Sequence, residues 1–114
     1  MKVVMGKIIK DLIGAKIIET IEVYDYKQIV TDMGIISLFN PVKCYMLQGR
    51  ALGFAEIVNE LENLKITGVF FQQCSFLKFE INNQLIVDIS LKDGDYSGPE
   101  STVINFFTGE IVSV

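Results

Sequence analysis

The clearest hydrophobic pattern in the chain is an alternation of apolar and polar residues in its second half. Apolar side chains fall at every second position over residues 77–81 and again over residues 85–91. Such alternation is typical of strands that bury one face. Asn82-Asn83-Gln84 between them predicts a three-residue hairpin loop with an Asn or Gln in the left-handed region, because that length keeps the apolar residues on one face. The predicted cross-strand pairs are Ile81 with Leu85, Phe79 with Val87, and Leu77 with Ile89.

A second pattern is a repeat of apolar spacing. A shift of 49 residues, without a gap, aligns residues 12–40 with residues 61–89. We interpret these stretches as two copies of one supersecondary unit, each with a leading leucine, a strand, a loop and a hairpin. Chance similarity between two β-rich stretches is the alternative. In the first copy Asp32-Met33-Gly34 takes the place of the hairpin turn, and we expect Gly34 to adopt a positive φ.

Helical spacing is confined to two segments. Residues 6–14 predict a short amphipathic helix that ends at Gly14. Residues 52–64 predict the main helix, because Phe54, Ile57 and Leu61 fall on one stripe while the glutamates lie largely off it. Near the end of the chain, residues 102–114 predict a hairpin across Thr108-Gly109.

These elements predict a mainly β, α+β fold in a single domain over residues 1–114. A chain of 114 residues, half of them hydrophobic, is long enough for one core and too short for two. We expect six to eight short strands in a strongly bent antiparallel sheet, or a partly open barrel or sandwich, built from two repeats with one main helix over one side.

Charge is distributed unevenly along the chain. The formal net charge is −4, but residues 1–55 carry seven basic and five acidic residues, whereas residues 56–114 carry three basic and nine acidic residues. An acidic surface repels the phosphates of nucleic acids and anionic lipids and attracts basic proteins. We therefore expect neither a nucleic-acid partner nor a membrane partner. A solvated surface that only maintains solubility is the alternative.

The amino-acid composition also reduces the number of catalytic and metal-binding sites that the chain can form. Histidine is absent, which removes the most common general base and metal ligand. Cys44 and Cys74 lie far apart without a CxxC motif, so we expect two free, buried thiols and no metal or redox centre. The N-terminus lacks a signal-peptide pattern, and no apolar run approaches the length of a membrane span, which predicts a cytoplasmic protein. We predict no catalytic residues, no cofactor and no enzymatic activity.

Three short motifs suggest chemistry at first sight. Asp93-Gly94-Asp95 superficially resembles a calcium loop but lacks the further oxygen ligands, so we favour a turn. Asp88 and Glu80 on adjacent predicted strands suggest an acid/base pair, but solvated carboxylates are favoured because no nucleophile is near. Residues 48–53 carry Arg50 between two glycines before the predicted helix and suggest an anion cradle, although a flexible loop is favoured.

One run resembles a family signature. Residues 90–100, SLKDGDYSGPE, match the pattern SLxxxDYxGPE, and the LxGxxI-like segment from Leu12 with the later Asn40-Pro41 turn is similar to the opening of the same proteins. The chain thus resembles small uncharacterised bacterial two-repeat β-rich proteins with a DYxGPE motif, some of which are suspected to be immunity proteins that neutralise a toxin by binding it. The resemblance implies protein binding and no catalytic residues.

Two functions remain open at this point. In the first, the protein is a cytoplasmic immunity protein whose acidic C-terminal half covers a basic toxin domain such as a nuclease. Its candidate partner-binding residues are Asp88, Asp93, Asp95, Tyr96 and Glu100. In the second, the chain is a small structural or oligomeric domain whose exposed apolar strand edge pairs with a second copy of itself.

Overall fold

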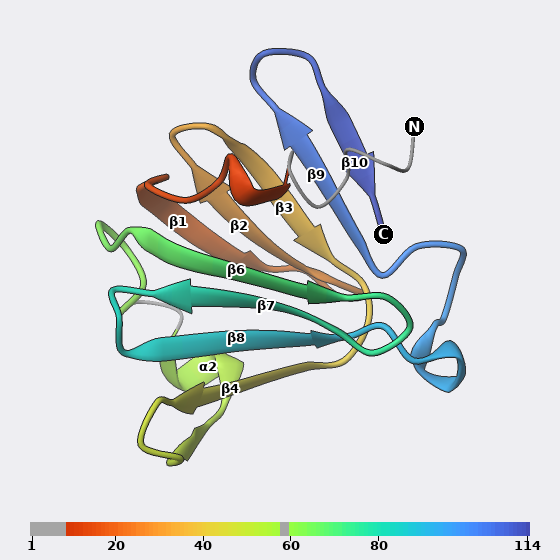
Figure 1. Ribbon diagram of the computed structural model, residues 1–114, viewed down its shortest axis with the longest axis horizontal. Coiled ribbons are helices and arrows are strands. Elements are labelled where there is room, and N and C mark those ends of the chain that lie inside the picture. The colour runs from red at the N-terminus through yellow and green to blue at the C-terminus, as the bar shows by residue number, and fades with distance from the viewer. Residues whose placement is uncertain (1–8, 58–59) are drawn as a thin grey trace.

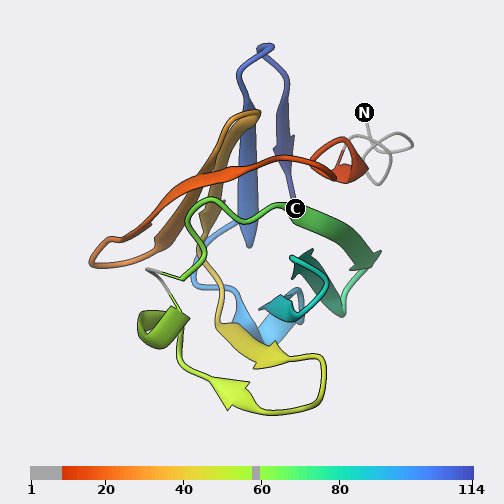
Figure 2. The same ribbon diagram turned by 90° about the vertical axis from the view of Figure 1, so that its left-hand side faces the viewer.

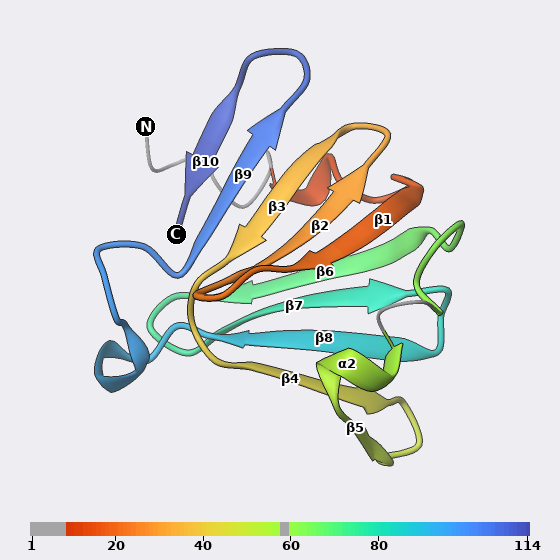
Figure 3. The same ribbon diagram turned by 180° about the vertical axis from the view of Figure 1, so that it is seen from behind.

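Residues 9–57 and 60–114 are described by a computed structural model, and in these ranges the chain is mainly β-strand. The strands form two antiparallel sheets of five strands each (Figures 1 and 3). Sheet 1 has the order β1-β2-β3-β9-β10, and sheet 2 has the order β5-β4-β8-β7-β6. The bounds are β1 (Ile17–Glu22), β2 (Lys27–Thr31), β3 (Gly34–Leu38), β4 (Val42–Met46), β5 (Ala51–Leu52), β6 (Ile66–Gln72), β7 (Phe76–Ile81), β8 (Leu85–Ser90), β9 (Thr102–Phe106) and β10 (Ile111–Ser113). The predicted mainly β fold is confirmed, as two antiparallel sheets rather than a closed barrel.

The apolar faces of both sheets share one core. Figure 2 shows the strands wrapping around a common interior. Sheet 1 contributes Ile29, Ile36 and Ile104 to it, and sheet 2 contributes Phe79 and Val87, all with at most 1% of their surface exposed. In β7 every second residue is buried, as the period of two predicts. The alternating pattern therefore sets which side chains of sheet 2 face outward.

Sheets 1 and 2 meet where β1 and β6 begin. Lys16 and Lys65 pair there in an isolated antiparallel bridge. Four backbone hydrogen bonds flank the bridge. The N–H of Gly14 donates to the carbonyl of Ile66, and the N–H of Asn63 donates to the carbonyl of Ile17. The N–H of Ile66 donates to the carbonyl of Ala15, and the N–H of Ile17 donates to the carbonyl of Leu64. A shift of each residue number by 49 turns the Gly14–Ile66 bond into the Asn63–Ile17 bond. The same shift turns the Ile66–Ala15 bond into the Ile17–Leu64 bond. The backbone around this bridge thus has an approximate two-fold arrangement, while the repeat in the sequence stays a prediction.

The β7–β8 hairpin has the predicted register. Ile81 pairs with Leu85, Phe79 with Val87, and Leu77 with Ile89. Asn82 and Asn83 adopt positive φ values of 54° and 55° in the three-residue loop, as expected for an Asn in the left-handed region. The strict alternation of apolar and polar residues was sufficient to predict this register, because in any other register apolar and polar side chains would share one face of the sheet.

The β2–β3 turn differs from the prediction. Among the glycines of the described residues, positive φ occurs at Gly14, Gly49 and Gly109 and not at Gly34. A Cβ atom at Gly34 would instead lie 2.5 Å from the carbonyl oxygen of Asn105 on the neighbouring strand β9. Glycine is therefore required at this position for close approach of two backbones rather than for a left-handed conformation.

The main helix predicted over residues 52–64 is wrong. Helix α2 covers only Phe54–Ile57, and Leu52 belongs to β5, which pairs with β4. At the other end Asn63 has a φ of 70°, which ends helical structure; residues 58–59 lie outside the described residues. The apolar stripe is nevertheless buried, because Phe54, Ile57 and Leu61 all join the core. One helical turn followed by a bend achieves the same burial as the longer helix.

Both ends of the described chain agree in part with the prediction. The C-terminal hairpin is confirmed, because β9 pairs with β10 and Gly109 adopts a φ of 104° in the loop. Of the predicted helix over residues 6–14, Ile9 and Lys10 are helical and residues 11–14 form turns, whereas residues 6–8 lie outside the described residues. Among the described helices, none has the length and apolar character needed to cross a membrane.

Candidate functional site

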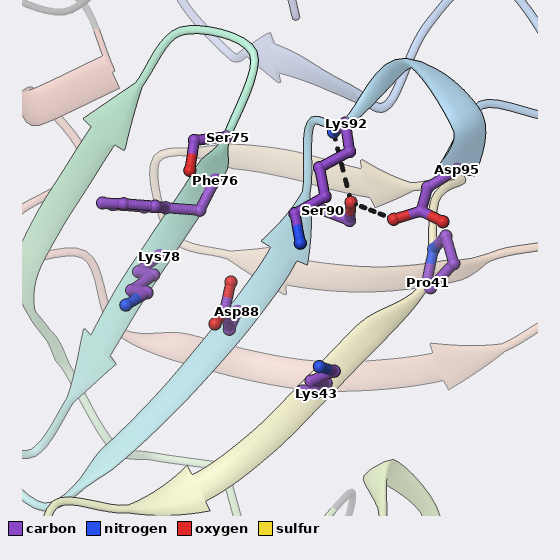
Figure 4. Close-up of a pocket in the computed structure, with 9 residues that line it drawn as sticks. All are labelled: Pro41, Lys43, Ser75, Phe76, Lys78, Asp88, Ser90, Lys92 and Asp95. Atoms are coloured by element: carbon purple, nitrogen blue, oxygen red, sulfur yellow. Dashed lines mark hydrogen bonds between the residues drawn. The ribbon is translucent and has the colours of Figure 1, made fainter.

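The outward face of sheet 2 carries a row of alternating charges. Lys78 on β7 and Lys43 on β4 are both paired with Asp88 on β8, so the carboxylate lies between the two lysines (Figure 4). These positions point away from the core because their neighbours in sequence, such as Phe79 and Val87, are buried. Strand alternation in three different segments thus brings the three charged groups together.

A shallow pocket of about 220 Å³ opens over this row. Its lining comes from β4, β7, β8 and the turns beside them, and consists of Pro41, Lys43, Ser75, Phe76, Lys78, Asp88, Ser90, Lys92 and Asp95. Three lysines therefore face two aspartates, and two serine hydroxyls and one aromatic ring complete the wall (Figure 4).

Polar contacts fix several of these side chains. Ser90 Oγ donates a hydrogen bond to the Asp95 carboxylate and accepts one from the backbone N–H of Lys92 at 3.2 Å. The Tyr45 hydroxyl lies 3.5 Å from Asp88 Oδ2, at the long limit for a hydrogen bond. The Lys78 ammonium lies 4.3 Å from the centre of the Phe76 ring, a cation–π distance. The rim formed by Ser90 and Asp95 is consequently better fixed than the row of lysines.

The connection between β8 and β9 borders the pocket. We call residues 91–101 the acidic loop; it includes the 3-10 turn η1 (Asp93–Asp95) and extends beyond the ends of the strands of sheet 2 (Figures 1 and 3). Asp93 and Asp95 are exposed, and Tyr96 is partly exposed. Partial burial raises the pKa of the Tyr96 hydroxyl, with smaller contributions from Cys74 and Asp93. The expected turn at Asp93-Gly94-Asp95 is confirmed.

The five predicted site residues are distributed over two neighbouring places. Asp88 and Asp95 line the pocket. Asp93 lies on the same 3-10 turn as Asp95, and Tyr96 follows that turn directly. Glu100 lies at the far end of the acidic loop, next to the buried Ser101. The charge analysis missed the lysines of the pocket. Lys78 was available from the predicted register, because it pairs with Asp88, whereas Lys43 depends on the pairing of β4 with β8, which no local pattern indicates.

The remaining candidate motifs do not form reactive sites. Glu80 pairs with Ile86 rather than with Asp88, and its carboxylate accepts a hydrogen bond from Thr67 Oγ1 at 3.0 Å. Arg50 follows the tight turn between β4 and β5, where its carbonyl accepts the Met46 N–H at 2.8 Å. Residues 47–50 are therefore a hairpin turn rather than a flexible loop, whereas the predicted helix entry is confirmed, because α2 begins at Phe54 directly after Gly53. Within the described residues no group of His, Cys, Asp and Glu is arranged to hold a metal ion.

The two cysteines differ in environment. Cys44 is buried on the inner face of β4, and this burial raises the pKa of its thiol from 9.0 to about 11, against a lowering contribution from Lys27. Such a thiol stays protonated at neutral pH and is a poor nucleophile. Cys74 is exposed in the turn between β6 and β7, with a φ of 61°. The prediction of two buried thiols is therefore wrong for Cys74, because the turn directs its side chain outward.

Comparison with protein-family models, with curated proteins and with solved structures finds no match for this chain. The resemblance based on the DYxGPE run therefore stays a prediction, as does the toxin-immunity function that it implies.

Proposed function

We propose that this protein is a non-enzymatic binding protein whose acidic loop docks on a basic surface of another protein. The observation that supports the proposal most is the preformed, projecting turn with Asp93 and Asp95. Ser90 anchors this turn at its base, because its hydroxyl donates to Asp95 and accepts from the backbone of Lys92. A fixed turn loses little conformational entropy on binding, which favours recognition.

Electrostatics supports a basic partner. Exposed carboxylates on a protruding loop are reached first by an approaching protein, and opposite charge raises the rate of encounter. Tyr96 directly after the turn offers an aromatic ring with a polar hydroxyl, a side chain enriched among residues that dominate binding energy. Asp88 lies between two lysines, so we assign it a smaller share of this attraction than Asp93 and Glu100.

Within this class we favour an immunity protein of the cytoplasm, with a basic toxin domain such as a nuclease as the partner. This narrower proposal rests on the resemblance of residues 90–100 and on the acidic balance of residues 56–114. Covering a basic nucleic-acid groove with an acidic loop would occlude it by charge and by volume.

Capture from a lysate of the source organism tests the proposal. The chain is immobilised as wild type, as Asp93→Lys/Glu100→Lys, and as the control Glu19→Lys/Glu22→Lys, which makes the same charge change on β1. Asp95 is left in place because it holds the turn. We expect a basic protein to be retained by the wild type and the control and lost from the loop variant. Equal retention by all three proteins would contradict a role for the acidic loop.

Self-association is the second candidate, favoured by the surface near β10. Ile111 on this edge strand is 66% exposed and Phe107 in the adjoining loop is 61% exposed. An open edge with exposed apolar side chains is a template for pairing with another strand. Light scattering at micromolar concentration separates the candidates, because edge pairing predicts a dimer whereas docking by the acidic loop predicts a monomer.

We also infer that the fold contains two copies of one unit. The four bonds beside the Lys16–Lys65 bridge exchange under a shift of 49 residues, and the strand irregularities at Ile17/Glu19 and Ile66/Gly68 differ by the same number. In a duplicated unit, Leu12→Ala and Leu61→Ala should destabilise the protein to a similar extent, because both leucines are fully buried. Urea denaturation measures both, and a large difference would count against the duplication.

A further inference from the structure

The pocket on sheet 2 concentrates positive charge in an acidic protein. The whole chain has ten basic and fourteen acidic residues, yet Lys43, Lys78 and Lys92 surround this one opening against Asp88 and Asp95. Local charge at the pocket is thus opposite in sign to that of the chain. A basic protein partner is attracted by the acidic loop, not by this arrangement, so the pocket requires a separate explanation.

The lysines are poised for an additional anion. In the described part of the chain, none of their ammonium groups lies within 4.0 Å of a carboxylate oxygen. Asp95 is engaged by Ser90 Oγ, so its charge is directed toward the rim. Lys78 is placed by its contact with the Phe76 ring, while Lys43 approaches from the opposite side of Asp88 (Figure 4). An oxyanion that reaches both lysines would gain charge-assisted hydrogen bonds from each, against repulsion from the Asp88 carboxylate that lies between them.

The other groups of the pocket favour a hydroxylated anion. The Asp88 carboxylate accepts hydrogen bonds but repels a second negative charge, so a hydroxyl donor suits the space beside it. Ser75 and Ser90 line the same opening. A volume of about 220 Å³ lies below the usual range for drug-sized ligands, which favours a small molecule as the occupant.

We propose that this pocket binds a small phosphomonoester of a polyhydroxy compound, with the phosphate between Lys43, Lys78 and Lys92 and a hydroxyl group on Asp88. The site does not depend on the protein-docking function proposed above, since Lys43 and Lys78 lie on β4 and β7, although the pocket shares Lys92 and Asp95 with the acidic loop. Inorganic phosphate alone should bind more weakly, because it uses the lysines but lacks the polyol hydroxyl groups that the proposal places beside Asp88.

Titration of the full chain, followed by amide NMR, tests the site with two probes, inorganic phosphate and glycerol 3-phosphate. Both are added at constant ionic strength against chloride. We expect saturable shifts at Lys78, Asp88, Ser90 and Lys92, with a dissociation constant for glycerol 3-phosphate on the order of 1 mM. Lys78→Gln should weaken binding about fivefold or more, and Lys65→Gln, an exposed lysine beside the loop at the other end of β7, should leave it unchanged.

The Asp88→Asn variant should change the affinity for phosphate in the direction opposite to Lys78→Gln. Removal of this charge should strengthen binding of inorganic phosphate about threefold or more, because only repulsion is lost. The gain for glycerol 3-phosphate should be smaller, because its hydroxyl groups lose a charged acceptor. Shifts that stay linear up to about 20 mM, equal losses in Lys65→Gln and Lys78→Gln, or weaker phosphate binding in Asp88→Asn would each overturn the proposal. Unchanged amide spectra outside the pocket verify that the variants fold.

Discussion

The strands β1–β3 and β6–β8 form two three-stranded units with the same order and different outer faces. Each is an antiparallel meander, and each contributes fully buried residues such as Ile36 and Phe79 to the shared core. The outward positions of β2 and β3 are uncharged, with Gln28 donating to Ser37 across the strands at 3.1 Å. At the outward positions of β7 and β8, Lys78 lies opposite Asp88.

The comparison shows that the inward and outward positions of these strands are under different constraints. Inward positions are constrained by close packing in both units, because each change of volume is felt by neighbours. Outward positions are free to vary, and only the second unit uses them to assemble charges beside the acidic loop. Charged outward positions on β7 and β8, beside uncharged outward positions on β2 and β3, agree with the binding role proposed for the second unit.

The largest expected effect concerns the inner face. Phe79→Ala should lower the free energy of unfolding by about 3–4 kcal/mol, because a fully buried ring is replaced by a cavity. Its outward neighbour Lys78→Ala should change it by less than about 0.5 kcal/mol. Urea denaturation measures both, and similar losses would show that the assignment of inner and outer faces is incorrect.

A smaller loss is expected at the turn of the first unit. Gly34→Ala should destabilise the protein by about 2–3 kcal/mol, since the added Cβ would meet the Asn105 carbonyl at 2.5 Å. Gly98→Ala is the matched control, because nothing lies within 4 Å of its Cβ position. Thermal denaturation compares the two variants. A stability of Gly34→Ala equal to that of the control would mean that β3 and β9 are not in close contact.

The stability of the protein should also depend on pH, because Cys44 is buried on the inner face of sheet 2. Burial raises the pKa of Cys44 from 9.0 to about 11, so the unfolded chain releases the thiol proton first as the pH rises. Stability should therefore be unaffected by this group below pH 9 and fall between pH 9 and 11, by roughly 1–2 kcal/mol. Denaturation of the wild type and Cys44→Ala at both pH values measures the difference. The same pH dependence in both proteins would remove Cys44 as its source.

Sequence patterns predicted the parts of this molecule that local rules determine. The β7–β8 register followed from strict alternation and loop length, because a slip by one residue would expose Phe79 and Val87. The helix over residues 52–64 was not determined by its apolar stripe, since Phe54 and Ile57 are buried from one helical turn and Leu61 is buried from a bend outside it. The pocket depends on Lys43 beside Asp88, a pairing of distant segments that topology alone provides. The residues of the acidic loop could be identified from the sequence because they are contiguous.

The association rate of the captured partner tests the central claim most directly. At low salt, Asp93→Lys/Glu100→Lys should slow association about tenfold and flatten its dependence on salt, because exposed charges govern encounter more than affinity. Its free energy of unfolding should change by less than about 1 kcal/mol, since Asp93 is exposed and Glu100 is only partly buried, and charges near the surface contribute little to stability. The control Glu19→Lys/Glu22→Lys should associate at nearly the rate of the wild type. Equal slowing by both double variants, or no slowing by either, would contradict the assignment of partner binding to the acidic loop.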